Sequence, residues 1–203
     1  GLYNSLKSRI EERTVENESI VNLPNWLSLT FRIENGDWFD LEKVTIHDYV
    51  QELNINEGHL TRTVTFSDAQ NRRTRLIQRR FVHMTYRHLA GLETTILPDN
   101  WSGTIQVRSA LDGRVENSLV RRYRRLATHH IDILDTGINE NGIIWLLGVT
   151  TQSHIRIAQS ARTEVFCDNQ QLQPEYAVIQ DNGYIGVECT IDVCPDHVLR
   201  IEK

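Results

Sequence analysis

Hydrophobic and polar residues alternate with a period of two along most of this chain. Between Leu27 and Ile33, for example, the odd-numbered positions are apolar and the even-numbered positions are polar. Because successive side chains of a strand point to opposite faces, this alternation predicts a half-buried β-strand. The same pattern predicts ten further strands, at Thr45–Ile55, His59–Phe66, Thr74–Val82, Leu89–Leu97, Gly103–Ser109, Thr128–Ile133, Ile143–Thr150, Ile155–Thr163, Glu175–Gln180 and Tyr184–Val193.

Clusters of Asn, Asp and Gly separate these predicted strands. Examples are Glu34–Asp37, Asn56–Gly58 and Asp181–Gly183, whose residue types tolerate the positive φ that tight turns require. Short turns of this kind favour hairpins over crossover helices. Since no run of ten to fifteen residues shows a clean amphipathic helical pattern, we predict an all-β fold, a large antiparallel β-sandwich.

Segment Leu6–Asn17 departs from this pattern, because it is rich in Glu and Arg and predicts a short helix or a flexible strap. With 203 residues, of which 39% are hydrophobic, the chain is long enough to bury a core, and we expect one domain over residues 1–203. The chain starts at Gly1 without a methionine, so we expect further residues upstream of it.

Composition and cysteine usage bear on the compartment and on metal binding. No apolar stretch approaches the roughly 20 residues that cross a bilayer, and the start lacks a signal peptide, so we expect a soluble, cytoplasmic protein without a membrane partner. The three cysteines, Cys167, Cys189 and Cys194, form no disulfide framework. Cys189 and Cys194 with His197 could hold a metal, but buried thiols on strands are far commoner, so we predict no metal site.

The charge is unevenly distributed. Residues 62–125 carry thirteen arginines against five acids, a net charge of +8, whereas the whole chain has −5 and the remainder therefore −13. The arginine-rich stretches could contact phosphates, but the chain is acidic overall and lacks a nucleic-acid-binding motif, so we predict no nucleic-acid partner. Two alternatives remain, namely cross-strand ion pairs and an acidic partner domain. The arginines are Arg62, Arg72, Arg73, Arg75, Arg79, Arg80, Arg87, Arg108, Arg114, Arg121, Arg122, Arg124 and Arg125.

Catalytic signatures with fixed local geometry are absent from the sequence, which contains no G-x-S-x-G, H-E-x-x-H, P-loop or G-x-G-x-x-G motif. Acidic residues are numerous, but their spacing selects no glycosidase pair. His129 and His130 would face opposite sides of a strand, one inward and one outward. We therefore predict that this chain has no catalytic residues and requires no cofactor.

Two tryptophans bear on sugar binding, because an exposed indole can stack on a sugar ring. Trp145 lies in the apolar run Ile143–Leu147, and we expect it in the core. Trp101 lies in a turn between two predicted strands and is the best candidate for an exposed contact, although core packing is the commoner fate of such a residue.

Several motifs resemble the N-terminal domain of glycoside hydrolase family 65, which includes maltose, trehalose and kojibiose phosphorylases. The resemblance is carried by Val21–Leu27, Trp38–Leu41 and Arg79–Met84, and most strongly by Gly103–Asn117. Beyond about residue 120 it rests on the strand pattern and on the region Thr150–Ala158.

The resemblance implies a supersandwich of the galactose mutarotase-like kind beside an (α/α)₆ barrel that carries the chemistry. In that family a barrel glutamate is the general acid, and phosphate or water attacks an α-glucoside with inversion. No residue here matches that glutamate or the phosphate-binding residues. The expected partners are thus the missing barrel of the same polypeptide, a second copy in a homodimer and, in the full-length enzyme, an α-glucoside disaccharide, with inorganic phosphate as co-substrate.

These points lead to one functional hypothesis and two alternatives. The first is a non-catalytic domain that supports the active-site entrance or the dimer contact, with carbohydrate or barrel contacts at Asn100, Trp101, Asp112, Arg114 and Asn117. The second is an autonomous carbohydrate-binding module with Trp101 as its platform. The third is a mutarotase-type enzyme, which needs a histidine and a carboxylate converging in a sheet concavity.

Overall fold

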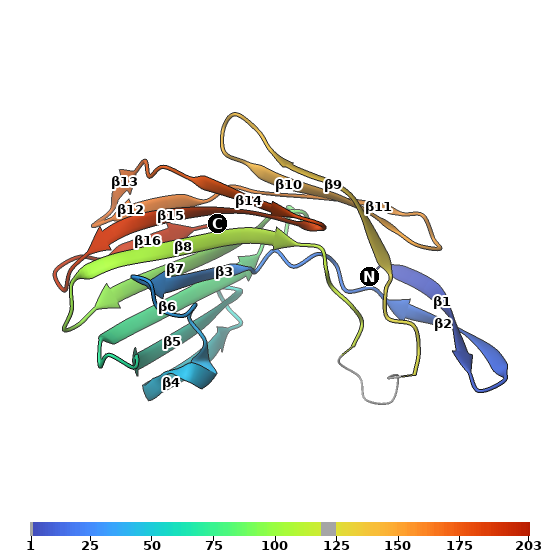
Figure 1. Ribbon diagram of the computed structural model, residues 1–203, viewed down its shortest axis with the longest axis horizontal. Coiled ribbons are helices and arrows are strands. Elements are labelled where there is room, and N and C mark those ends of the chain that lie inside the picture. Colours follow the sequence, from blue (N-terminus) through green and yellow to red (C-terminus); the bar gives the residue numbers. More distant parts are fainter. Residues whose placement is uncertain (1, 119–124) are drawn as a thin grey trace. The chain divides into compact units, whose positions relative to one another are not determined.

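The computed structural model describes residues 2–118 and 125–203 and confirms the predicted all-β class (Figure 1). One short 3₁₀ helix, η1 (Leu41–Lys43), interrupts the strands, and no helix of the described residues has the length and apolar character needed to cross a membrane. The strands are β1 (Tyr3–Ile10), β2 (Arg13–Ile20), β3 (Leu29–Ile33), β4 (Thr45–Asn54), β5 (His59–Ser67), β6 (Arg73–Val82), β7 (Ala90–Pro98), β8 (Gly103–Asp112), β9 (Ile131–Ile138), β10 (Ile144–Thr150), β11 (Arg156–Ala161), β12 (Glu164–Cys167), β13 (Gln170–Leu172), β14 (Ala177–Asp181), β15 (Tyr184–Val193) and β16 (Leu199–Glu202).

The chain divides into two compact units, each assembled from segments that are distant in sequence. Unit 1 comprises Gly1–Ser28, Ala110–Ala161 and Val178–Val187. Unit 2 comprises Leu29–Ser109, Arg162–Ala177 and Glu188–Lys203. Strands β8 and β15 contribute residues to both units, and the single domain expected over residues 1–203 stays a prediction.

Unit 2 contains a seven-stranded antiparallel sheet with the order β13-β12-β16-β7-β6-β5-β4. Strand β3 pairs antiparallel with β8 in the four-stranded sheet β14-β15-β8-β3. Unit 1 contains the hairpin β1-β2 and the three-stranded sheet β11-β10-β9. Neighbours along the chain are thus mostly neighbours in a sheet, as the turn residues between them predict.

The core of unit 2 lies between one face of the seven-stranded sheet and the inner faces of β3, β8 and β15. Val64, Leu76 and Ile96 form a continuous cross-strand row on β5, β6 and β7, and all three are fully buried. Phe31 and Ile105 belong to the same buried cluster from the opposite side. The alternation seen in the sequence therefore buries one face of each strand, which gives the predicted sandwich.

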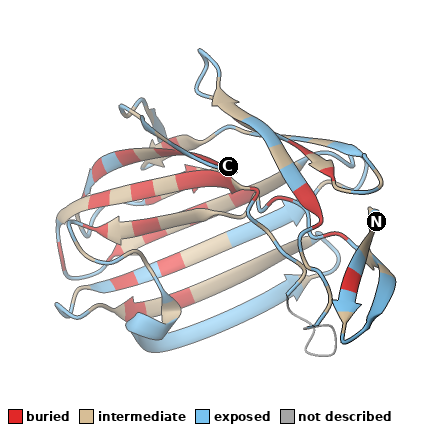
Figure 2. Ribbon diagram, turned by 45° about the vertical axis from the view of Figure 1, so that its right-hand side comes forward, coloured by how far each residue is buried: buried red, intermediate tan, exposed pale blue. Residues whose placement is uncertain are grey.

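The seven-stranded sheet continues beyond this core. Every residue of β4 except Asn54 is exposed, and the strand is drawn in pale blue along its length in Figure 2. Its partner β5 buries only Val64 and Phe66, and the last four residues of β6 are exposed. The edge of the sheet formed by β4 and the end of β6 is thus not covered by a second layer among the described residues of unit 2.

The helix or strap predicted at Leu6–Asn17 is wrong, because the segment forms the β1-β2 hairpin. Register pairs run from Tyr3 with Ile20 to Ile10 with Arg13, and Glu11 takes a positive φ of 55° in the turn. The charged side chains that suggested a helix lie mostly on exposed positions of the two strands.

Trp145 also departs from expectation. Its neighbours Ile144 and Leu146 are buried, so the alternation of β10 places Trp145 on the opposite face, where it is only half-buried. There the indole lies over Gly137, and a Cβ atom at Gly137 would come within 2.6 Å of the Trp145 ring. The glycine is therefore required by the close approach of that ring.

A buried polar cluster joins the start of β1 to the segments around β9 and β10 in unit 1. The Asn4 amide donates to His130 Nδ1 over 3.2 Å and to Thr151 Oγ1 over 3.1 Å, while its Oδ1 accepts from the backbone N–H groups of Gln152 and Ser153. His130 is buried, whereas His129 is exposed beside Asp132, as predicted, although both residues precede β9 and do not lie on a strand. Since Nδ1 of His130 accepts, this ring is neutral.

This cluster predicts a loss of stability in mild acid. Burial, reinforced by the charge of His129, lowers the pKa of His130 below its ordinary 6.5, so the unfolded chain takes up a proton before the folded chain does. The free energy of unfolding should therefore fall as the pH drops below about 6.5 toward the folded-state pKa. His130→Gln should flatten this part of the profile in urea unfolding, whereas His129→Gln should reduce it only slightly, because burial is the larger cause of the lowered pKa of His130. An equal effect of both variants would contradict the assignment.

Candidate functional site

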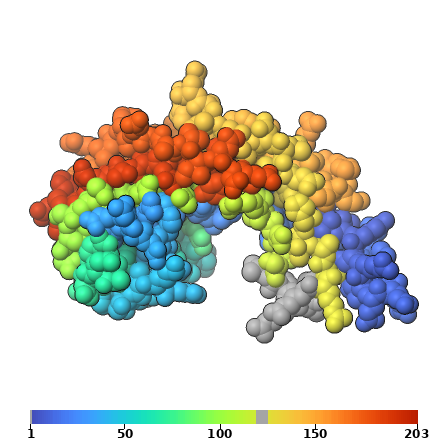
Figure 3. All heavy atoms as spheres, viewed as in Figure 1, coloured from blue at the N-terminus to red at the C-terminus, as the bar shows by residue number. Residues whose placement is uncertain are grey.

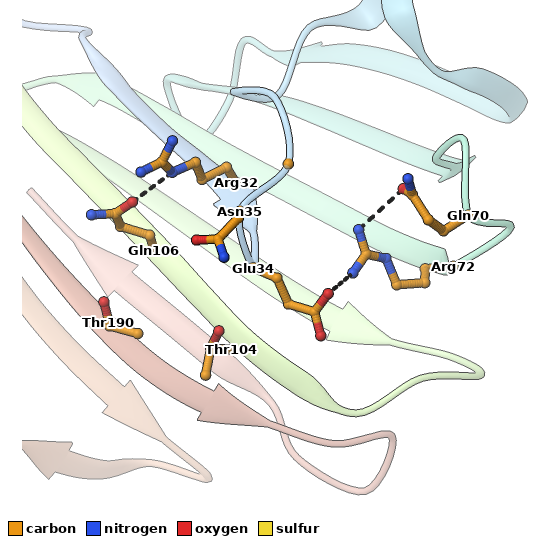
Figure 4. Close-up of a pocket in the computed structure, with 9 residues that line it drawn as sticks. Arg32, Glu34, Asn35, Gln70, Arg72, Thr104, Gln106 and Thr190 are labelled. Atoms are coloured by element: carbon orange, nitrogen blue, oxygen red, sulfur yellow. Dashed lines mark hydrogen bonds and ion pairs between the residues drawn. The ribbon is translucent and has the colours of Figure 1, made fainter.

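An open, polar depression of about 620 Å³ lies on unit 2 (Figure 4). It is built on the solvent-facing side of β3 and β8, where the residues opposite to the buried ones are polar. The lining residues are Arg32, Glu34, Asn35, Gly36, Gln70, Arg72, Thr104, Gln106 and Thr190.

Arg72 closes one side of the depression through ion pairs. Its Nε donates to Asp68 Oδ2 over 2.6 Å, and its Nη1 donates to Glu34 Oε2 over 2.7 Å. The guanidinium group also lies over the Trp101 ring, 5.8 Å from its centroid. Only 15% of the Arg72 side chain is exposed, so the group is held in place and holds the loop at Asp68 against β3.

A row of hydrogen bonds crosses the other side of the depression. Arg32 and Gln106 are register partners on β3 and β8, and the Arg32 Nε donates to Gln106 Oε1 over 2.5 Å. Gln106 in turn donates to Glu188 over 2.9 Å, and Glu188 is ion-paired with Arg108. The cationic groups of Arg32 and Arg108 both lie over the ring of Trp38, at 4.9 and 4.1 Å from its centroid.

This arrangement favours binding over bond cleavage. Amide, hydroxyl and guanidinium groups are suited to sugar hydroxyls, and the depression is open enough to admit a polar ligand. Glu34 is the one carboxylate among the described lining residues, and Glu188 lies behind Gln106. Both accept hydrogen bonds from arginines, so neither is placed as a glycosidase acid. Histidine–carboxylate pairs occur at other turns of the described chain, but none of them lines this depression.

The candidate contact residues predicted from the sequence fall into both units. In unit 2, Asn100 accepts from the backbone N–H of Arg73 over 2.7 Å and donates to the carbonyl of Asn71 over 3.1 Å. Trp101 is buried in the core, and its Nε1 donates to Thr74 Oγ1 over 3.0 Å. It is therefore not the exposed aromatic platform that a sugar site would need, and it follows the core-packing alternative instead.

The other three candidates lie in unit 1. Arg114 makes a bidentate ion pair with Asp112, at 2.9 and 3.0 Å, and its guanidinium group lies over Tyr184. That pair lowers the pKa of Asp112 although burial alone would raise it. Asn117 accepts from the backbone N–H of Asn22 over 3.0 Å and donates to the carbonyl of Ile20 over 2.7 Å. Asp112 and Arg114 stabilise their own turn and Asn117 binds the segment after β2, while their contact with sugar or barrel stays a prediction.

Five of the ten described arginines of residues 62–125 form ion pairs within their own unit. Arg72, Arg73, Arg79 and Arg108 bind acids in unit 2, and Arg114 binds Asp112 in unit 1. These five support the ion-pair alternative, and an acidic partner domain for the other arginines stays a prediction. Arg121, Arg122 and Arg124 lie outside the described residues.

A second cluster of reactive side chains was missed from the sequence. Cys167, Asp168 and His197 converge at one end of the seven-stranded sheet, with their potential ligand atoms within 4.8 Å of one another. A hydrogen bond from the backbone N–H of Val198, together with His197, lowers the pKa of Asp168, and burial raises the pKa of the Cys167 thiol. Cys189, which the sequence grouped with His197, lies instead in the core, where burial raises its pKa to about 11.

The locked position of Arg72 predicts a measurable loss of stability when it is removed. Arg72→Ala would leave Asp68 without its ion-pair partner and remove packing from Trp101, so we expect the free energy of unfolding to fall by about 1.5–3 kcal/mol. Arg73 is the matched control, because its pair with Asp99 is exposed, and Arg73→Ala should cost at most about 1 kcal/mol. Urea denaturation measures both, and equal losses would show that Arg72 holds nothing in place.

Comparisons with known proteins agree on the kind of domain. The family model described as "Glycosyl hydrolase family 65, N-terminal domain" matches residues 1–203. An uncharacterized glycosyl hydrolase of Mycobacterium tuberculosis is 40% identical over 203 residues, which cover all of this chain and 15% of that protein. A kojibiose phosphorylase of Halothermothrix orenii is 23% identical over all of this chain and 24% of its own length.

A solved structure shows the same fold. The "Putative kojibiose phosphorylase from human microbiome" aligns with a TM-score of 0.74 and 15% sequence identity over 99% of this chain and 25% of its own. The chain thus spans between about one seventh and one quarter of the length of these relatives.

Proposed function

Because this chain belongs to the N-terminal domain family of glycosyl hydrolase family 65, we propose that it is a non-catalytic domain of a larger enzyme that acts on α-glucosides. The observation that carries the proposal is the match over all 203 residues, which make up only 15–25% of the relatives. Kojibiose phosphorylases among the relatives favour inverting phosphorolysis of a disaccharide, with inorganic phosphate as co-substrate. The reacting groups would then lie in the rest of the polypeptide.

The exposed end of the seven-stranded sheet supports a role in contacts between domains. We define the interdomain surface as the large apolar side chains that β4, the end of β6 and the two adjoining turns expose. Ile55 is 84% exposed and Met84 is 90% exposed, and Figure 3 shows β4, in light blue, at the surface of unit 2. The surface comprises Ile46, Tyr49, Val50, Leu53, Ile55, Phe81, Val82, Met84, Tyr86 and Leu89.

The strand register brings the two turns of this surface together, whereas alternate residues of the strands point to opposite faces, so that Tyr49 and Leu53 share one face of the sheet and Val50 the other. Asn54 pairs with His59, and His59 pairs with Phe81, so the turn after β4 and the loop after β6 lie at the same end of the sheet. An apolar surface of this kind is unusual on a monomeric protein and marks a site of contact. We assign the contact to the remainder of the same polypeptide, since the part of the relatives outside the matching domain is about three or more times as long as the domain itself.

Substitution of Met84 tests this assignment in two settings. In the isolated chain, Met84→Asp should change the free energy of unfolding by no more than about 0.5 kcal/mol, because the side chain is exposed. In the full-length polypeptide it should destabilise by about 1–3 kcal/mol, because a carboxylate would then be buried against apolar groups. Met84→Leu is the control and should be neutral in both. Equal responses of the two proteins to Met84→Asp would refute the assignment.

A carbohydrate-binding module is the second candidate, and the polar depression of Figure 4 favours it. Against it, two guanidinium groups already lie over the ring of the nearby Trp38, so this ring does not offer a free face on which a sugar could stack. Calorimetric titration of the isolated chain with glucose, maltose, trehalose and kojibiose should therefore give no binding heat, and a phosphorolysis assay should give no turnover. Millimolar or tighter binding that Gln106→Ala abolishes would establish the module instead, and turnover would establish a catalytic site.

A further inference from the structure

We propose that Cys167, Asp168 and His197 form a binding site for a zinc ion. Cys167 is the last residue of β12, Asp168 follows it in the turn to β13, and His197 lies in the turn before β16. A thiol, an imidazole and a carboxylate are the ligand types that Zn²⁺ takes in proteins. The site lies in unit 2, and it is independent of the interdomain surface and of the depression.

The sheet register explains why these residues meet. Strand β12 pairs with β13 on one side and with β16 on the other, and Cys167 is the register partner of both Gln170 and Leu199. Asp168 and Asn169 form the two-residue turn between β12 and β13, with φ of 49° and 66°. Two consecutive residues with positive φ are the mark of a type I′ hairpin turn, which Asp and Asn tolerate. His197 lies two residues before Leu199 and thus beside this turn.

Hydrogen bonds fix the orientation of the potential ligands. The backbone N–H of Asp168 donates to the carbonyl of Val198, and the N–H of Val198 donates to Asp168 Oδ1 over 2.9 Å. The other carboxylate oxygen, Oδ2, is thereby aimed at His197 and Cys167. The turn before β16 is closed by a bond from the His197 N–H to the carbonyl of Cys194. Such outer contacts are what holds the ligands of a metal site in place.

Two of the three separations fit a tetrahedral ion. With Zn–S of about 2.3 Å and Zn–N or Zn–O of about 2.0 Å, a sulfur ligand lies about 3.5 Å from a nitrogen or oxygen ligand. Cys167 Sγ lies 3.6 Å from His197 Nδ1 and 3.9 Å from Asp168 Oδ2. The Nδ1 to Oδ2 distance of 2.5 Å is that of a hydrogen bond, and this pair would open by about 1 Å as zinc replaces the shared proton.

Other cations fit the cluster less well. Ca²⁺ and Mg²⁺ take oxygen ligands, and only one of the three groups offers oxygen. The fourth position of the tetrahedron is open to water or to the thiol of Cys194, which precedes His197 by three residues in a C-x-x-H spacing and is only partly buried. A bound ion would tie the β12-β13 hairpin to the turn before β16.

Cobalt and zinc titrations of this chain test the proposal. With Co²⁺ as the probe, ligation by Cys167 should produce a sulfur-to-cobalt charge-transfer absorption. With Zn²⁺, competition against a chromophoric chelator should give one ion per chain and a higher midpoint of thermal unfolding. Cys167→Ser and His197→Ala should each abolish the absorption or weaken Zn²⁺ binding at least tenfold.

Asp196→Asn is the matched control, because Asp196 lies in the same turn as His197 but outside the cluster. It should bind both ions like the parent chain. Circular dichroism of each variant separates loss of a ligand from loss of the fold. Absence of the cobalt absorption in the folded parent chain, or equal Zn²⁺ affinity of the parent, Cys167→Ser and His197→Ala, would overturn the proposal and leave an aspartate–histidine pair that only caps the turn.

Discussion

The packing of one sheet face in unit 2 is the constraint from which its other features follow. Val64, Leu76 and Ile96 are covered by residues of β3, β8 and β15, and this layer fixes the register of the strands across the sheet. A slip by one residue would turn the buried row to the solvent, so the positions of all attached turns are fixed as well. The register therefore sets the positions of the residues that line the depression and of the cluster formed by Cys167, Asp168 and His197.

The same packing also explains the interdomain surface. The covering layer extends over only part of the seven-stranded sheet, so β4 and the end of β6 carry apolar side chains that the described residues of unit 2 leave exposed. A strand edge and face of this kind would promote aggregation if they stayed open in the cell. Since the relatives are several times longer than this chain, the simplest explanation is that the remaining polypeptide buries the interdomain surface.

The sequence predicted the class of fold well, because period-two alternation reports directly on which face of a strand is buried. Strands β4 to β8 lie within a few residues of their predicted ranges. It failed at β1 and β2, where charged residues on an exposed hairpin imitate a polar helix, and at Trp145, where an apolar run hides the alternation of faces. The depression and the cluster at Cys167 could not be predicted, since they depend on pairing between strands far apart in the sequence, such as β12 with β16.

The central claim is that the interdomain surface is buried in the full-length protein. Amide hydrogen exchange measured on the isolated chain and on the full-length polypeptide tests it without any substitution. The claim predicts strong additional protection in residues 46–55 and 81–89 of the full-length protein, with little change in the core of unit 2, such as residues 74–77. Equal exchange of residues 46–55 and 81–89 in both proteins would contradict it.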